Sequence, residues 1–378
     1  MRIVVAPDKF KGCLSAVEVS RAIEIGLRRA VSDVHIDCCP MADGGEGTVE
    51  ALVAATGGRF IVRRVTGPLP EMKVDARFGI LGDGATAVIE MSAASGLSLL
   101  RADDRDPMGT TTFGTGELLM AAAEMGISRI ILGIGGSATI DGGVGCAQAC
   151  GLPVILEGGE TVSPGEPLVG ADVHRVVLIK HGRGSVIERV RIEVACDVTN
   201  PLCGDDGAAV VYGPQKGATA KQIHELDSAL MQLARRTGKL DQAKLSGAGA
   251  AGGLGFAMAA FFGATLKSGV EIVMDAVHLR DRLKSADLCL SGEGRFDSQS
   301  LRGKTVGGVA EICQQIGVPC IVLAGTVDQK VDFSGLGITA AYSICGESTA
   351  LEESIKNAAE LISTAAENLL RSMPGKPG

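Results

Sequence analysis

Apolar runs alternate with amphipathic stretches at the front and the back of the chain, which is the pattern of strands followed by helices. The strands predicted in these two parts are 2–6, 34–40, 287–291, 319–324 and 339–344. The predicted helices are 17–30, 47–56, 269–284, 304–316 and 350–371. Five strands alternating with helices are enough for one doubly wound parallel sheet. The pattern therefore predicts one α/β domain built from both ends of the chain.

Capping signals precede four of the predicted helices. A Ser or Thr three residues before a Glu or Gln can form a capping box, in which each side chain binds the other residue's backbone N–H. The pairs with this spacing are Ser15 with Glu18, Thr219 with Gln222, Ser268 with Glu271 and Thr349 with Glu352. They predict helix starts near residues 16, 220, 269 and 350.

The middle of the chain has a different pattern. Over 60–100 the apolar runs are short and separated by Gly and Pro turns, which predicts antiparallel or mixed β structure. Further predicted elements are helices over 117–125 and 220–236 and strands over 129–134, 175–180 and 191–197. We therefore predict an inserted mixed α/β domain at 63–267, and a discontinuous first domain at 1–62 and 268–378.

Four apolar runs end in loops that mix glycine with carboxylates. They are RIVVAPDKFKGCLS (2–15), HIDCCPMADGGEGT (35–48), RIILGIGGSATIDGGVG (129–145) and DLCLSGEGRFDSQSLRGK (287–304). Ligands of open parallel sheets bind beyond the carboxyl ends of the strands. Glycines let the backbone approach a ligand, helix N-termini hold anions, and carboxylates can hold a divalent cation. Together the loops predict an enzyme that binds a magnesium nucleotide and transfers a phosphoryl group.

Two glycine-rich segments have the letters of nucleotide motifs without their context. GAGAAG (247–252) matches G-x-G-x-x-G, but no strand precedes it and no acidic residue follows at the ribose position. A phosphate loop and tight helix packing both remain open for this segment. GKT (303–305) resembles the end of a Walker A loop, but Ser298 stands where that loop needs glycine.

Composition and charge disfavour several other classes of protein. A net charge of −8, 3% aromatic residues and no Trp argue against nucleic acid as a partner. The chain becomes polar at Asp8, unlike a signal peptide, and the uncharged stretch 247–266 is too rich in glycine to predict a membrane span. Eleven cysteines without zinc-type spacing indicate reduced, buried thiols in a cytoplasmic protein.

Nine ordered motifs resemble those of the type-1 glycerate kinases. They are APDKFKGCLSAVEVSRAI, MADGGEGTVEALVAATGG, FGILGDGATAVIEMSAASGL, TTTFGTGEL, GIGGSATIDGG, ACDVTNPLCG, YGPQKGAT, GAGAAGGLG and SGEGRFDSQSLRGK. The resemblance covers about 1–371 and is weakest over 151–190. It implies ATP- and Mg²⁺-dependent phosphorylation of D-glycerate to 2-phosphoglycerate. It also implies a flavodoxin-like domain from both chain ends, an inserted second α/β domain, and a ligand cleft between the two.

The resemblance places candidate site residues in these motifs. The predicted catalytic residues are Lys11, Asp197, Arg295 and Asp297, with Arg295 as the clamp for the substrate carboxylate. The predicted nucleotide-binding residues are Lys216, Gly249, Gly252, Gly253, Glu293 and Lys304. The predicted glycerate-binding residues are Asp8, Asp43, Gly44, Gly45, Ser137 and Asp141, and the predicted magnesium ligands are Asp43 and Asp297. Which of Asp8, Asp43, Asp197 and Asp297 is the general base stays open.

The chain departs from the family pattern at two of these motifs. Lys9 stands where many members have Ser, so Lys11 is the better candidate for an essential cation. Ile140 stands where many have Asn, so a ligand role at 140 is not expected. Phosphorylation of the 3-hydroxyl or of another small hydroxy acid remains an alternative. A non-catalytic sensor of an anionic metabolite is disfavoured, because it would not need acidic residues in four loops.

Overall fold

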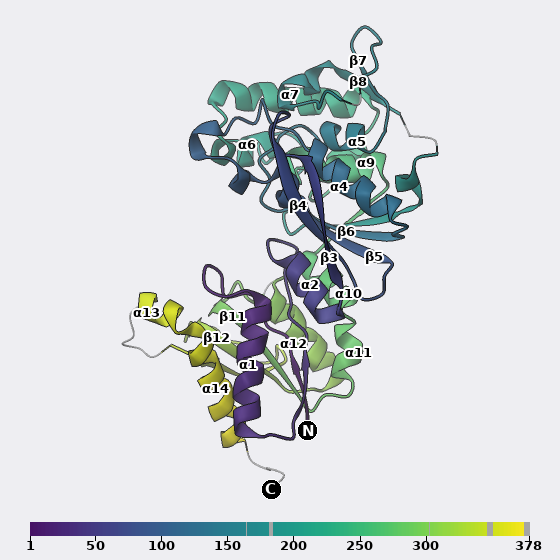
Figure 1. Cartoon of the computed structure of the whole chain (residues 1–378). Helices are drawn as coiled ribbons and strands as arrows, with labels where there is room; N and C mark the ends of the chain where they lie inside the picture. Colours follow the sequence, from purple (N-terminus) through teal and green to yellow (C-terminus); the bar gives the residue numbers. More distant parts are fainter. Residues whose placement is uncertain (164, 181–183, 302, 346–350, 374–378) are drawn as a thin grey trace. The chain divides into compact units, whose positions relative to one another are not determined.

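The computed structural model describes residues 1–163, 165–180, 184–301, 303–345 and 351–373. The chain divides into two compact units (Figure 1). Unit 1 is Met1–Asp43, Glu50–Gly57 and Val270–Gly378, and unit 2 is Gly44–Val49 and Gly58–Gly269. The α/β class is confirmed, with a parallel sheet drawn from both chain ends and a mixed sheet from the middle segment.

The sheet of unit 1 has the strand order β13-β12-β11-β1-β2, and every neighbouring pair is parallel. The strands are β1 (Arg2–Val5), β2 (His35–Cys38), β11 (Leu288–Phe296), β12 (Cys320–Val327) and β13 (Ile338–Ser343). This order is that of the flavodoxin-like doubly wound fold. The predicted sheet is confirmed, but β11 continues to Phe296, so Glu293 and Arg295 lie on a strand and not in the predicted loop.

Helices cover both faces of this sheet. On one face, α1 (Ala16–Ala30) and α14 (Ala358–Ser372) lie side by side over an apolar core that includes Ile3, Leu290 and Leu323 (Figure 1). Gly26 is required where α1 meets α14, because an added Cβ would lie 2.0 Å from the carbonyl oxygen of Ser363. On the opposite face, α12 (Thr305–Ile316) packs on β11 and β12. The other helices that include residues of unit 1 are α2 (Thr48–Thr56), α10 (Gly269–Ala276), α11 (Leu279–Leu283) and α13 (Leu351–Lys356).

The helix starts predicted from capping signals have mixed outcomes. Both halves of the capping box form at Ser15 with Glu18 and at Thr219 with Gln222. The single helix predicted over 269–284 is wrong, because His278 takes a left-handed backbone conformation, with φ of 53°, between α10 and α11. The helix predicted over 350–371 is likewise divided into α13 and α14, and its proposed cap Thr349 lies outside the described residues.

The sheet of unit 2 has the order β10-β9-β6-β5-β4-β3. Its strands are β3 (Arg59–Thr66), β4 (Lys73–Ile80), β5 (Thr86–Glu90), β6 (Arg129–Gly133), β9 (Arg191–Ala195) and β10 (Thr265–Lys267). The β3–β4 and β4–β5 pairs are antiparallel and the remaining pairs are parallel, which confirms the predicted mixed sheet. The predicted boundary between residues 62 and 63 falls inside β3.

Short elements complete unit 2. Its helices are α3 (Ser92–Ser95), α4 (Phe113–Glu124), α5 (Val144–Ala149), α6 (Ala208–Tyr212), α7 (Ala220–Arg236), α8 (Leu240–Ala243) and α9 (Ala250–Phe261). Short 3₁₀ helices span Leu97–Leu99, Ala102–Asp104, Gly170–Arg175, Val186–Arg189 and Pro214–Lys216. The strand predicted near 175–180 is β8 (Val176–Ile179), and it pairs with β7 (Val154–Leu156), which its three residues made too short to predict. Among the described residues, no helix is both long and apolar enough to cross a membrane.

Candidate active site

Asp8 and Glu293 lie at the carboxyl ends of two neighbouring strands of unit 1. Beyond β1, the chain continues to pair with β11, and the backbone N–H of Asp8 donates to the carbonyl of Gly292 at 2.8 Å. Thr305, the first residue of α12, donates its hydroxyl to Oδ2 of Asp8, and the backbone N–H of Lys9 donates to Oδ1 at 2.7 Å. Asp8 is thus held at the N-terminus of a twelve-residue helix, where the backbone favours anions.

Burial perturbs the proton equilibria of both carboxyl groups. Burial raises the pKa of Asp8, the hydrogen bond from Thr305 opposes that shift, and the charge of Asp43 adds to it. Burial also raises the pKa of Glu293 to about 7, with Ser300 and Lys304 opposing the shift and the charges of Asp8 and Asp297 adding to it. Oε1 of Glu293 is buried and has no hydrogen-bond partner among the described residues. Glu293 can therefore take up or release a proton near neutral pH.

Charged side chains surround these two carboxyl groups. Arg295 forms an ion pair with Asp297, with Nε 3.3 Å from Oδ2, and its side chain is 73% exposed. Lys9, which the sequence analysis set aside in favour of Lys11, forms an ion pair with Asp43 at 3.7 Å. The exposed Lys11 lies next to β11, since a Cβ on Gly294 would be 3.4 Å from its backbone nitrogen. The structure thus brings most of the residues predicted in unit 1 to one edge of the sheet.

The donor set at this edge fits a magnesium ion. The negative charges of Asp8 and Asp297 both raise the pKa of Glu293, so each of them repels the charge on that carboxyl group. Mg²⁺ prefers hard oxygen ligands and is commonly bound by one or two carboxylates together with substrate phosphates. A divalent cation held by Asp8 and Asp297 would offset this repulsion. The other predicted magnesium ligand, Asp43, is engaged by Lys9, and its role as a ligand stays a prediction.

Asp141 in unit 2 is held by hydrogen bonds from its own domain. It is fully buried, and its carboxylate accepts hydrogen bonds from the backbone and hydroxyl of Thr112 and from the backbones of Gly143 and Gly145. Burial raises its pKa and these hydrogen bonds oppose the shift. Four protein donors leave little capacity for a substrate. These hydrogen bonds hold the 141–145 loop, and the role of Asp141 in binding glycerate stays a prediction.

Lys216 is buried next to the same loop. Its Nζ donates to Oγ of Ser137 at 2.6 Å and to the carbonyl of Thr139 at 2.8 Å, and the residue is only 2% exposed. Burial lowers the pKa of Lys216 to about 7, with the charge of Asp141 opposing the shift. The hydroxyl of Thr139 is buried without a hydrogen-bond partner among the described residues. Lys216 and Ser137, predicted for different ligands, are thus direct partners.

The glycines predicted to bind nucleotide are packed against other backbone segments. A Cβ on Gly252 would lie 1.9 Å from the carbonyl oxygen of Thr139, and one on Gly253 would lie 2.8 Å from Cα of Gly142. A Cβ on Gly249 would lie 2.2 Å from the carbonyl of Pro201. Close packing was one of the two alternatives left open for the segment 247–252, and these contacts explain why glycine is needed at all three positions. The role of these glycines in binding nucleotide stays a prediction.

Three further predicted residues shape turns in unit 2 and at its border. Asp197 is exposed and accepts a hydrogen bond from the backbone N–H of Gly269, the first residue of α10, at 2.9 Å. Gly44 has a φ of +89°, and an added Cβ would lie 2.7 Å from Cβ of Ala195. The carbonyl of Gly45 accepts the hydroxyl of Thr48 at 2.6 Å. These contacts are structural, and the catalytic and substrate-binding roles of the three residues stay predictions.

The hydroxyl partners of Asp8 and Asp141 were not predicted from the sequence. Thr305 binds Asp8 and Thr112 binds Asp141, and neither threonine was a candidate. Thr305 does stand at a predicted helix start, where Ser and Thr are common for local reasons. Ile140, for which the sequence predicted no ligand role, is fully buried in the core of unit 2.

The fold places charged groups at the carboxyl ends of parallel strands, which is where α/β enzymes bind their ligands. The glycerate kinase family matches residues 3–374 of the chain. A glycerate kinase of Halalkalibacterium halodurans is 45% identical over 97% of both chains. A glycerate 2-kinase of Escherichia coli is 46% identical over 99% of this chain and 98% of its own. A crystal structure described as glycerate kinase 2 from Salmonella typhimurium is 45% identical and covers 98% of this chain and 97% of its own, with a TM-score of 0.87. The chain belongs to the glycerate kinase family.

Close packing at Gly252 predicts a large loss of stability on substitution. Gly252→Ala should lower the free energy of unfolding by about 3 kcal/mol or more, because the methyl group has no room beside Thr139. Gly263→Ala is the matched control: its φ of +63° is similar and nothing lies within 4 Å, so only backbone strain of about 1 kcal/mol is expected. Urea unfolding followed by circular dichroism measures both. Equal losses would contradict the packing explanation.

The buried Lys216 predicts a specific pH dependence of stability. Its folded pKa of about 7 lies below the unfolded value, so unfolding takes up a proton between these two pKa values. The unfolding free energy of the wild type should therefore rise relative to Lys216→Met above pH about 7, by up to about 1.4 kcal/mol per pH unit. Below that pH the difference should be constant. Urea titrations of both proteins from pH 6 to about 9.5 test this. If the difference in unfolding free energy between the two proteins does not change with pH, the ammonium group of Lys216 stays charged in the folded protein, and Asp141 is the group that keeps it so.

Proposed function

We propose that this protein transfers the γ-phosphoryl group of ATP, with Mg²⁺, to the 2-hydroxyl of D-glycerate and forms 2-phospho-D-glycerate. Membership of the glycerate kinase family supports the reaction class and the acceptor. The name glycerate 2-kinase of the Escherichia coli relative, at 46% identity over nearly the full length, supports the position of the hydroxyl. The observation that carries the chemistry is the Glu293 carboxyl with a pKa of about 7 beside Asp8 and the N-terminus of α12.

Each step of phosphoryl transfer has a candidate residue at this edge of the sheet. Glu293 receives the proton of the attacking hydroxyl, because its pKa of about 7 lets the carboxyl group take up a proton near neutral pH. Lys11, Lys304 and the N-terminus of α12 offset the charge on the phosphate oxygens. The exposed guanidinium of Arg295 holds the carboxylate of glycerate by two parallel hydrogen bonds.

Magnesium has a defined part in this proposal. When bound, Mg²⁺ places positive charge on the phosphate oxygens and so stabilises the transition state. Asp8 and Asp297 would hold it, because both charges act on Glu293 and both groups offer hard oxygen donors. Thr305 fixes the orientation of Asp8 by its hydrogen bond, which makes Thr305 a positioning residue.

The proposed ligands are glycerate and ATP, with neither nucleic acid nor membrane as a partner. The cytoplasm is the proposed compartment, because all eleven cysteines are free and many are buried, which suits a reducing environment. The predicted binding of both ligands between the two domains stays a prediction.

An activity assay tests the proposed reaction. Purified protein with MgATP should release ADP only when D-glycerate is present, and EDTA should stop the reaction because the phosphates lose their cation. Phosphorus NMR of the product should show the 2-phosphate ester. No ADP with D-glycerate would overturn the kinase proposal. A 3-phosphate product, or a preference for another hydroxy acid, would overturn only the proposed acceptor.

Two substitutions test the proposed roles at the end of β11. Asp297→Asn and Glu293→Gln should each lower kcat/KM by about 100-fold or more, on the order of 2.7 kcal/mol of transition-state stabilisation. Glu293→Gln should also remove the ionisation near pH 7 from the pH profile of kcat/KM. Asp281→Asn and Glu311→Gln are matched controls on exposed helix positions of the same unit and should retain wild-type rates. Wild-type rates in Asp297→Asn or Glu293→Gln would leave that residue with a structural role only.

A further inference from the structure

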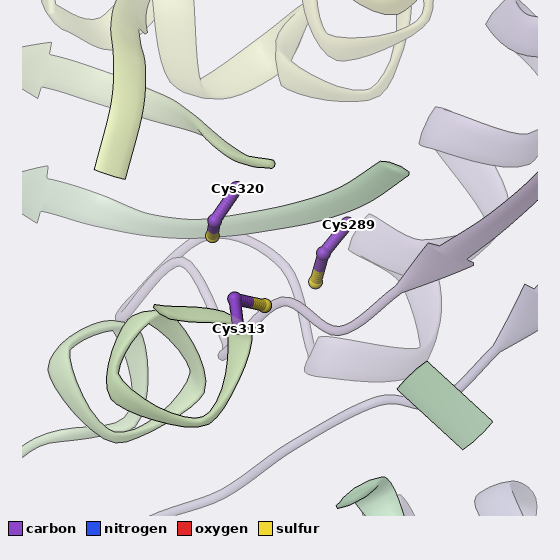
Figure 2. A group of neighbouring side chains, drawn as sticks. All are labelled: Cys289, Cys313 and Cys320. Atoms are coloured by element: carbon purple, nitrogen blue, oxygen red, sulfur yellow. The ribbon is translucent and has the colours of Figure 1, made fainter. Parts of the chain in front are cut away.

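Three cysteine thiols meet inside unit 1, away from the residues assigned to catalysis. Cys289 lies at the start of β11, Cys320 at the start of β12, and Cys313 in the last turns of α12. All three residues are 0% exposed, and their sulfur atoms lie within 4.8 Å of one another. Figure 2 shows the two strand thiols and the helix thiol converging on one point between the sheet and the helix. We refer to these three residues as the cysteine cluster.

The secondary structure explains why these thiols converge. Cys289 and Cys320 are directly paired in the parallel register of β11 and β12, so their side chains lie on the same face of the sheet. The neighbouring Leu288 and Ile321 belong to the core on the opposite face. Cys313 lies on the buried side of α12, four residues after Val309, and faces the strand pair. The spacing of 24 and 7 residues along the chain resembles no metal motif, which is why the sequence indicated inert packing.

The pKa values of the three thiols in the cysteine cluster depend on contacts among the thiols and on their burial. Hydrogen bonds from Cys289 and Cys320 lower the pKa of Cys313 to about 5, while the same contacts and burial raise the pKa of Cys289. Among the described residues, only cysteines and burial perturb these groups, and no Lys, Arg or His does. The site therefore has no cationic side chain to neutralise a negatively charged complex.

We propose that the cysteine cluster is a binding site for a soft trivalent ion, for which arsenic(III) is the probe. Three sulfur ligands match a pyramidal three-coordinate centre. Within the described residues, no further His, Cys, Asp or Glu atom joins the cluster, whereas structural zinc takes four ligands in a tetrahedron. Soft sulfur donors also select soft ions over magnesium or calcium.

Charge further favours a trivalent ion. Three thiolates with a monovalent copper ion would carry two negative charges, and with a divalent ion one, inside an apolar core. Burying an uncompensated charge costs several kcal/mol. Arsenous acid avoids this cost, because As(OH)₃ and three thiols give As(SR)₃ and three waters. Three As–O bonds are replaced by three As–S bonds, each thiol proton leaves in a water, no electron is transferred, and the product is neutral.

Burial also determines how fast such an ion can enter. None of the three cysteines is exposed, so arsenic(III) must wait for a local opening between α12 and the strand pair. Binding should therefore be slow, and it should retard exchange of backbone amides in α12 by linking this helix covalently to β11 and β12.

Binding of arsenite to the full-length protein tests this proposal. Protein reduced with a phosphine and free of small thiols is titrated with sodium arsenite, and bound arsenic is counted by native mass spectrometry. X-ray absorption at the arsenic edge counts the As–S bonds. The wild type should bind one ion with three As–S bonds, and Cys313→Ser should weaken binding by about 100-fold. Cys39→Ser removes another buried thiol of unit 1 and should bind like the wild type.

Two further variants serve as controls for the arsenite experiment. Cys313→Ala replaces the serine variant if that protein does not fold, as judged by its thermal transition. Cys150→Ser tests another close thiol pair, formed with Cys146, and should leave the three-sulfur centre unchanged. Equal affinity of the wild type and both Cys313 variants would overturn the proposal, as would a bound centre with only two sulfurs. Tighter binding of Zn²⁺ than of arsenic(III) at the cluster would overturn it as well.

Discussion

The parallel pairing of β1 with β11 is the interaction on which unit 1 depends. It joins residues such as Arg2 and Asp287, which are 285 positions apart in the chain, and the register places Ile3 opposite Leu288. Closing so long a loop costs conformational entropy. This cost is offset only when the complete sheet and the helices on both of its faces have formed. The same pairing continues past β1, so that the backbone of Asp8 binds Gly292 and its carboxyl group lies near Glu293.

Burial and hydrogen bonding of ionisable groups change their pKa at three places in the molecule. Burial raises the pKa of Glu293 on β11 to about 7, and it lowers the pKa of Lys216 beside Ser137 and Thr139 to about 7. The pKa of the carboxyl group rises and the pKa of the amine falls, because desolvation disfavours the charged form of each group. In the cysteine cluster, hydrogen bonds between thiols divide the protons unequally among identical groups. In each case the residue type is ordinary and the surroundings make it unusual.

Glycine and aspartate have structural roles that their place in the sequence does not distinguish from ligand binding. Gly252 and Asp141 have the composition of a ligand loop, yet Gly252 packs on the carbonyl of Thr139 and Asp141 binds four protein donors. A backbone that must approach a phosphate and a backbone that must approach another backbone both require a residue without a Cβ. A carboxylate that binds a cation and one that binds amide N–H groups are likewise the same residue in the sequence.

The sequence by itself determined the order and type of most elements, the strands drawn from both chain ends, and two capping boxes, at Ser15 and Thr219. These features depend on periodicity and on contacts within a few residues, which the sequence contains directly. The break at His278, the extension of β11 through Glu293, and the partnership of Thr305 with Asp8 came only from the tertiary structure. So did the buried Lys216 and the cysteine cluster. Each of these depends on which distant segments become neighbours and how much water they exclude, and neither quantity can be read from local spacing.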